Sequence, residues 1–80
     1  MDNQASVQET IARIRGARFR ITRWDGYDER EVDTFLDELI AALGRGERPG
    51  PETVPVFTSR RMRPAYRKAD VDGFLEGLVG

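Results

Sequence analysis

The stretch "GYDEREVDTFL", residues 26–36, returns in altered form as "AYRKADVDGFL", residues 65–75. Six residues recur at a constant offset of 39 positions: Tyr27, Val32, Asp33, Phe35, Leu36 and Leu39 correspond to Tyr66, Val71, Asp72, Phe74, Leu75 and Leu78. Self-similarity at a fixed spacing is the sequence signature of repeated structural units. The sequence therefore predicts repeat 1 over about 11–43, a linker over 44–53 and repeat 2 over about 54–79.

The charge pattern duplicates with the motif, although the net charge is only −1. In each half, a basic run is followed by an acidic one that overlaps the motif. The basic residues are Arg13, Arg15, Arg18, Arg20 and Arg23 in the first half, and Arg60, Arg61, Arg63, Arg67 and Lys68 in the second. Such runs are typical either of solvated faces or of binding surfaces, and the pattern leaves both open.

The clearest predicted element is a helix over 28–43. Asp28 is a good N-cap residue, and Glu31 three positions later completes a capping-box pattern. Apolar residues then recur with helical spacing at Val32, Phe35, Leu36, Leu39, Ile40 and Leu43. Gly44 is expected to end the helix.

Two further helices are predicted, over about 67–79 and 6–15. The helix over 67–79 keeps an apolar stripe, but Arg67 cannot cap it, and Gly73 and Gly77 weaken it by roughly 1 kcal/mol each. Packing must therefore hold it. For the helix over 6–15, Ser6 and Glu9 suggest a capping box.

The stretches 19–23 and 56–60 have an extended pattern, and a short two-stranded pairing between them is predicted. One repeat cannot bury its own stripe, so the two stripes are expected to pack together within the chain, with partner binding as the alternative. The predicted fold is a small, mostly α single domain of two tandem helical repeats with pseudo-twofold symmetry. The expected core or interface residues are Tyr27, Val32, Phe35, Leu36, Leu39, Tyr66, Val71, Phe74, Leu75 and Leu78.

The composition argues against several classes of function. The 80 residues include no cysteine and no histidine, which argues against disulfides, zinc or copper sites and Ser/His or Cys/His catalysis. No loop has phosphate-binding glycine spacing. Asp33 and Asp72 are expected to make a local ion pair or hydrogen bond rather than to act as an acid–base pair. The candidate partners are Arg20, Arg23, Arg60 and Arg61. We therefore expect no enzyme activity, cofactor, metal or small-molecule substrate.

The composition also suggests where the protein resides. No apolar run reaches the roughly 20 residues that span a bilayer. The polar start "MDNQASVQET" is unlike a secretory signal peptide. A cytoplasmic protein is expected.

Phe19 with Gly26, Tyr27, Asp28, Glu31, Val32, Asp33, Phe35 and Leu36 resembles the N-terminal domain of DivIVA, the bacterial cell-division and polar-growth scaffold. Repeat 2 departs from this pattern, with Ala65, Arg67 and Asp70 in place of the Gly, Asp and Glu. Tandem copies of this kind occur in short actinobacterial proteins, and the composition, rich in Arg and poor in Lys, fits a GC-rich genome.

The resemblance implies a non-enzymatic scaffold or interaction module that docks to a DivIVA-like scaffold or to itself. In the family this domain forms a parallel dimer, and its loop tips enter the membrane. Carried over, the candidate membrane contacts are Arg20, Arg23, Trp24, Met62 and Arg63. The protein would then lie at the inner face of the membrane, at the pole or septum. No heptad-bearing segment follows either predicted helix.

Trp24 has two interpretations at this stage, because it can either contact an anionic membrane or pack over the small core. A peripheral membrane-binding module is accordingly the alternative function. A small DNA-binding regulator is a more remote one, since the best-defined helix is acidic and the helix over 6–15 offers only Arg13 and Arg15. No nucleic-acid partner is expected.

Overall fold

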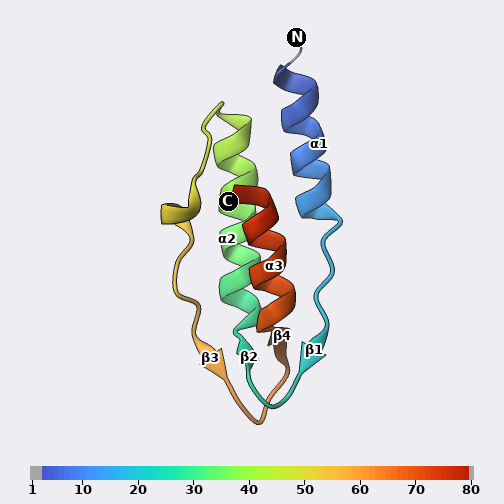
Figure 1. Ribbon diagram of the computed structural model, residues 1–80, viewed down its shortest axis with the longest axis vertical. Coiled ribbons are helices and arrows are strands. Elements are labelled where there is room, and N and C mark those ends of the chain that lie inside the picture. Colours follow the sequence, from blue (N-terminus) through green and yellow to red (C-terminus); the bar gives the residue numbers. More distant parts are fainter. Residues whose placement is uncertain (1–2, 80) are drawn as a thin grey trace.

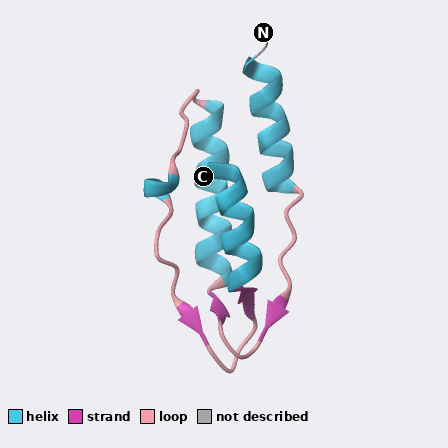
Figure 2. Cartoon of the chain, viewed as in Figure 1, coloured by secondary structure: helices cyan, strands magenta, loops and turns pink. Residues whose placement is uncertain are grey.

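The computed structural model describes residues 3–79, which form three α-helices and a small four-stranded antiparallel sheet (Figures 1 and 2). The helices are α1 (Asn3–Arg15), α2 (Glu29–Gly44) and α3 (Lys68–Val79), with a short 3-10 helix η1 (Pro51–Thr53) in the linker. The strands are β1 (Ile21–Thr22), β2 (Gly26–Tyr27), β3 (Ser59–Arg60) and β4 (Ala65–Arg67). The prediction of a small, mostly helical domain is confirmed.

The molecule is elongated, measuring 47 × 21 × 18 Å, with the sheet at one end and the helices extending from it (Figure 1). Helices α2 and α3 both leave the sheet in the same direction, whereas α1 runs towards it (Figure 1). None of the helices within residues 3–79 is long and apolar enough to cross a membrane.

Helix α2 follows the sequence prediction closely. The Asp28 carboxylate accepts a hydrogen bond from the Glu31 amide at 3.0 Å, which confirms the N-cap. At the other end, Gly46 has a φ of 84° and its amide bonds to the Leu43 carbonyl, while the Glu47 amide reaches the Ala42 carbonyl. These bonds form a Schellman motif. The residue that stops the helix is therefore Gly46 rather than the expected Gly44.

The predicted capping boxes are wrong in detail. The Glu31 carboxylate does not turn back to the Asp28 amide but accepts the Thr58 amide at 2.7 Å. The Asp28 amide bonds instead to the Thr58 carbonyl. Helix α1 is already helical at Asn3, so Ser6 lies inside it and caps nothing.

The pairing predicted between 19–23 and 56–60 is also wrong. The strand order is β1-β4-β2-β3, so the two predicted partners form opposite edges of the sheet. The central pair β2–β4 sets Tyr27 opposite Tyr66, and β1 and β3 add to its two sides. Pairing of the central strands places the residues before each helix at the middle of the sheet.

The core lies between the three helices and the sheet. Of the ten residues expected in the core or interface, six are buried: Val32, Phe35, Leu36, Leu39, Val71 and Leu75. The other four, Tyr27, Tyr66, Phe74 and Leu78, are half-buried against that cluster. Ile14 of α1 and Phe57 before β3 complete it. The core thus contains residues of all three helices, and this packing holds α3, which begins after a residue, Arg67, that is a poor N-cap.

We predict that Gly26→Ala destabilises the domain, because strand β4 leaves no room for a side chain there. A Cβ at Gly26 would lie 2.5 Å from the Tyr66 carbonyl oxygen and 2.8 Å from the Ala65 Cβ. The expected loss is about 1–3 kcal/mol. In a domain of this size, thermal unfolding should then shift downward by about 4–8 °C per kcal/mol.

Gly73→Ala is the matched control for that variant. No neighbouring atom lies within 4 Å of a Cβ at Gly73, which is exposed inside α3. Alanine should raise the unfolding temperature, since it favours a helix over glycine by up to about 1 kcal/mol. Equal melting temperatures for both variants and the wild type would contradict the close approach of β2 and β4.

Candidate functional site

The two strand-connecting loops meet at the end of the molecule farthest from the N-terminus (Figure 1). The Met62 amide donates to the Arg23 carbonyl at 2.7 Å, which joins the β3–β4 loop to the β1–β2 loop. Met62 has a φ of 63°, a region that non-glycine residues rarely adopt. We call this joined pair, residues 23–25 and 61–64, the loop end.

Large apolar side chains at the loop end face solvent. Trp24 is 77% exposed and Met62 is 81% exposed. The interpretation that Trp24 packs over the core is therefore wrong. The Trp24 amide instead bonds to the Thr22 hydroxyl at 3.2 Å, which fixes the backbone while the indole stays outside. The two joined loops therefore each present one large apolar side chain to solvent.

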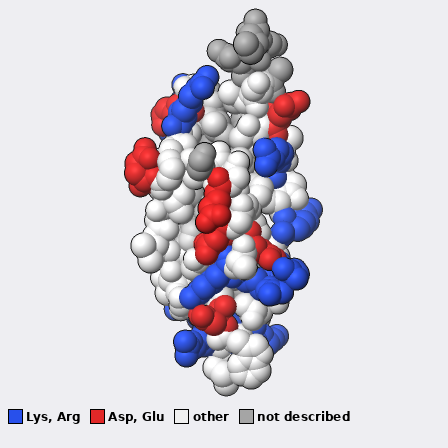
Figure 3. Space-filling view, in the orientation of Figure 1, with Lys and Arg blue, Asp and Glu red and all other residues white. Residues whose placement is uncertain are grey.

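Basic side chains accompany these apolar side chains. Arg23, Arg61 and Arg63 are exposed. Figure 3 shows lysine and arginine side chains on both sides of the uncharged tip. Arg20 behaves differently, because its guanidinium forms two hydrogen bonds with Asp70 of α3, at 3.0 and 2.8 Å. Of the five candidate membrane contacts, four lie in the loop end and Arg20 is held in an ion pair.

Asp25 is the acidic residue of the loop end, and the Lys68 ammonium lies 3.1 Å from its carboxylate. The same ammonium stands 5.5 Å from the centre of the Tyr27 ring. Sequence reasoning missed this role of Lys68, although the residue belongs to the basic run of repeat 2. With the Asp25 carboxylate in an ion pair with Lys68, the three exposed arginines give the loop end a positive charge.

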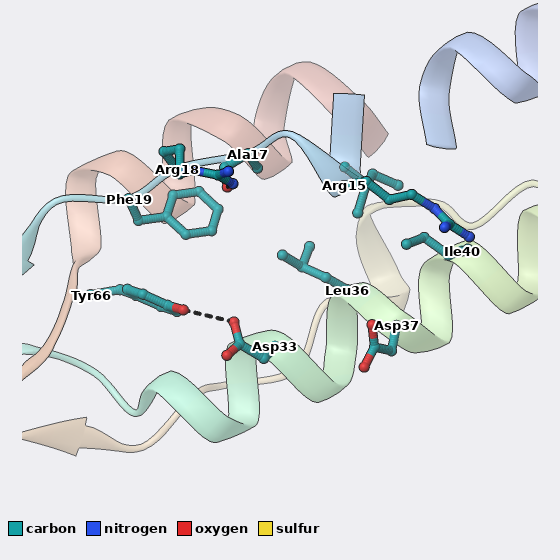
Figure 4. Close-up of a pocket in the computed structure, with 10 residues that line it drawn as sticks. Arg15, Ala17, Arg18, Phe19, Asp33, Leu36, Asp37, Ile40 and Tyr66 are labelled. Atoms are coloured by element: carbon teal, nitrogen blue, oxygen red, sulfur yellow. Dashed lines mark hydrogen bonds between the residues drawn. The ribbon is translucent and has the colours of Figure 1, made fainter. Parts of the chain in front are cut away.

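Two tyrosine–aspartate pairs connect the sheet to the helices. The Tyr27 hydroxyl donates to Asp72 of α3 at 2.8 Å. The Tyr66 hydroxyl donates to Asp33 of α2, also at 2.8 Å (Figure 4). Each aspartate thus makes a hydrogen bond, as expected, but the arginine partners expected for them are wrong. The arginines pair elsewhere, Arg20 with Asp70 and Arg60 with Asp28.

Each tyrosine ring also packs against a phenylalanine. Tyr27 lies 5.3 Å from Phe57, and Tyr66 lies 5.2 Å from Phe19, measured between ring centres. Burial, followed by the hydrogen bond to Asp72, raises the pKa of Tyr27 to about 12. Burial and the hydrogen bond to Asp33 raise the pKa of Tyr66 to about 12. The carboxylates of Asp72 and Asp33 therefore act as hydrogen-bond acceptors for the two tyrosine hydroxyls.

A shallow groove of about 470 Å³ lies beside one of these pairs, between α2 and the end of α1 (Figure 4). Arg15 and Arg18 line one side, and Asp33 and Asp37 line the other. Phe19, Ile40 and Tyr66 give it a half-buried apolar floor. The sequence offered no signal for this groove, because its two walls come from segments whose packing depends on the tertiary fold.

Comparisons with known proteins give no family for this chain. No protein-family model matches it, and no curated protein or solved structure shows significant similarity to it.

We predict that both tyrosines ionise near pH 12 rather than near the ordinary value of about 10. A raised pKa in the folded state means that each pair contributes stability that is fully present below about pH 10. That contribution is lost as pH rises towards 12. Ultraviolet absorbance at 295 nm reports the titration directly, because Tyr27 and Tyr66 are the only tyrosines in the sequence.

Asp72→Asn and Asp33→Asn should each lower the titration midpoint of one tyrosine, and Asp37→Asn serves as the control that leaves both unchanged. Circular dichroism recorded in parallel separates ionisation in the folded protein from alkaline unfolding. Phenolate formation near pH 10 with the helix signal intact would refute the two pairs.

Proposed function

We propose that the two halves of the chain, 11–43 and 54–79, are related units that pack about a pseudo-twofold axis in the manner of a DivIVA-like dimer. The observation that carries this proposal is the reciprocity of the tyrosine–aspartate pairs. Tyr27 of the first half reaches Asp72 of the second, and Tyr66 of the second reaches Asp33 of the first. Each residue stands 39 positions from its counterpart.

Backbone contacts at the helix starts support the same relation. The Thr58 amide donates to Glu31 and the Thr58 carbonyl accepts the Asp28 amide. The counterparts in the other half do the same, since the Arg20 amide donates to Asp70 and the Arg20 carbonyl accepts the Arg67 amide. A repeated set of contacts that crosses between halves in both directions is the arrangement expected of an isologous interface.

On this basis we propose a non-enzymatic interaction or scaffold module of bacterial cell division or polar growth. It docks to a DivIVA-like scaffold, or to itself, and acts in the cytoplasm at the inner face of the membrane at the pole or septum. The resemblance of 26–36 to the DivIVA signature supports the family assignment. The parallel course of α2 and α3 from one sheet supports the dimer-like build (Figure 1).

Shortening the linker tests the internal pairing. Thr58 lies beside Asp28 at the start of α2, so the chain after α2 must return along the length of a 16-residue helix, about 24 Å. Deleting residues 46–53 leaves a connection from Arg45 to Thr58 that reaches only about 17 Å. The halves should then pair between two chains, and light scattering should record a doubled mass with an unchanged helix signal.

Replacing residues 46–53 by glycine and serine at constant length is the control, and it should keep the mass of the wild type. A shortened variant that stays monomeric with native circular dichroism would show that the halves do not need each other as proposed.

The loop end favours a second candidate function, peripheral binding to an anionic membrane. Trp24 and Met62 are exposed together, and Asp25 is paired with Lys68, which leaves arginines beside the apolar side chains. Tryptophan prefers the membrane interface, and each basic residue near an anionic surface adds about 1 kcal/mol.

Co-sedimentation with phosphatidylglycerol vesicles tests this candidate. Trp24→Ala should weaken binding at least about tenfold, since burial of an aromatic side chain contributes about 1.5–3 kcal/mol. Val56→Ala is the matched control, because Val56 is 99% exposed but lies outside the loop end, and it should bind as the wild type does. Wild-type protein that stays in the supernatant would exclude the membrane function.

A further inference from the structure

The groove between α1 and α2 combines an apolar floor with walls of opposite charge (Figure 4). Its basic wall is Arg15, at the end of α1, and Arg18 in the extended segment that follows. Its acidic wall is Asp33 and Asp37, which stand four residues apart and so one above the other on α2. This division of charge distinguishes the groove from the loop end, where exposed arginines accompany exposed apolar side chains.

The charged side chains of the two walls are not paired with each other by salt bridges in residues 3–79. Arg18 instead bonds to the carbonyl of its neighbour Ala17 at 3.1 Å. Asp33 uses one oxygen to hold the Tyr66 hydroxyl. Charged groups that face one another across a groove and remain unpaired are available to a bound molecule.

The apolar floor is also incompletely buried. Leu36 and Ile14 beneath it are buried, but Phe19, Ile40 and Tyr66 remain half-exposed along the groove. Recognition of an amphipathic helix in a groove uses apolar anchors spaced at i, i+3, i+4 and i+7. A volume of about 470 Å³ accommodates such anchors rather than a whole folded domain.

We propose that this groove is a docking site for an amphipathic helix of a partner protein, with basic side chains along one edge of its apolar stripe and acidic side chains along the other. The basic edge faces Asp33 and Asp37, and the acidic edge faces Arg15 and Arg18. A segment with one sign of charge on both edges meets like charge at one wall, which costs affinity. Nucleic acid and anionic lipid are disfavoured for the same reason.

A second groove provides an internal comparison. It is smaller, about 230 Å³, and runs along α3, where Asp72, Leu75, Glu76 and Val79 stand 39 positions after Asp33, Leu36, Asp37 and Ile40. Its other side consists of Pro51 and Val54 and carries no arginine. The divided charge is thus a property of the first groove, and Glu76 offers a control position for Asp37.

The test uses the full 80-residue chain and three labelled synthetic helical peptides of about 18 residues, or five turns. All three carry the same leucine stripe. One has lysines on one edge and glutamates on the other, one has lysines on both edges, and one has glutamates on both. Fluorescence anisotropy measures their affinities for the wild type, for Arg15→Glu/Arg18→Glu, for Asp37→Lys and for Glu76→Lys.

The wild type and Glu76→Lys should bind the mixed peptide about tenfold more tightly than either uniform peptide. Arg15→Glu/Arg18→Glu makes both walls acidic and should shift the preference to the lysine peptide. Asp37→Lys should shift it towards the glutamate peptide. Circular dichroism confirms that each variant is folded, and because the substituted side chains are exposed, folding should be retained.

Three outcomes would overturn the proposal. One is the same order of peptide affinities in all four proteins, and another is a switch caused by Glu76→Lys rather than by Asp37→Lys. The third is a wild-type dimer, without peptide, that Arg15→Glu/Arg18→Glu dissociates, because it would make a second copy of the chain the occupant. The inference does not depend on the DivIVA resemblance, and the linker deletion tests that proposal separately.

Discussion

The structure depends on one pair of strands, β2 and β4, which place Tyr27 and Tyr66 side by side. Each tyrosine ring packs against a phenylalanine, and its hydroxyl donates a hydrogen bond to an aspartate on a helix. Both contacts join the two halves of the chain. A small domain without disulfides has few other means of fixing its helices to its sheet. The strand pair sets the positions of the first turns of α2 and α3, and the core follows from them.

The same constraint separates two surfaces. Because β2 and β4 occupy the centre of the sheet, the loops on their far side project from one end and carry Trp24 and Met62 into solvent. The helices rise from the other side, and α1 lies against α2, which creates the charge-divided groove of Figure 4. A contact at the loop end and a helix docked in the groove therefore do not compete for space. Two separate surfaces of this kind fit the scaffold role proposed above.

Local signals predicted the helices well because caps and periodicity act over a few residues. Asp28 caps α2 as expected, and the apolar stripes of α2 and α3 lie in the core. The sheet could not be predicted in the same way, since strands of two or three residues carry almost no pattern and their order is set by tertiary packing. The exposure of Trp24 was open for a related reason. The sequence allowed a buried or an outward indole, and the structure has the indole exposed on two loops that the hydrogen bond from the Met62 amide to the Arg23 carbonyl joins.

The interleaved strand order also bears on how the protein is made. Among the strands of residues 3–79, β1 pairs with β4 alone, so Ile21 cannot form its strand pair until Tyr66 is present. Pairing between residues so distant in sequence requires closure of a long loop and slows folding. On the ribosome, the first half emerges with its apolar helix stripe uncovered until β4 and α3, residues 65–79, have been synthesised. The exposed acidic residues of α2, Asp33, Asp37 and Glu38, then help to keep the nascent chain soluble.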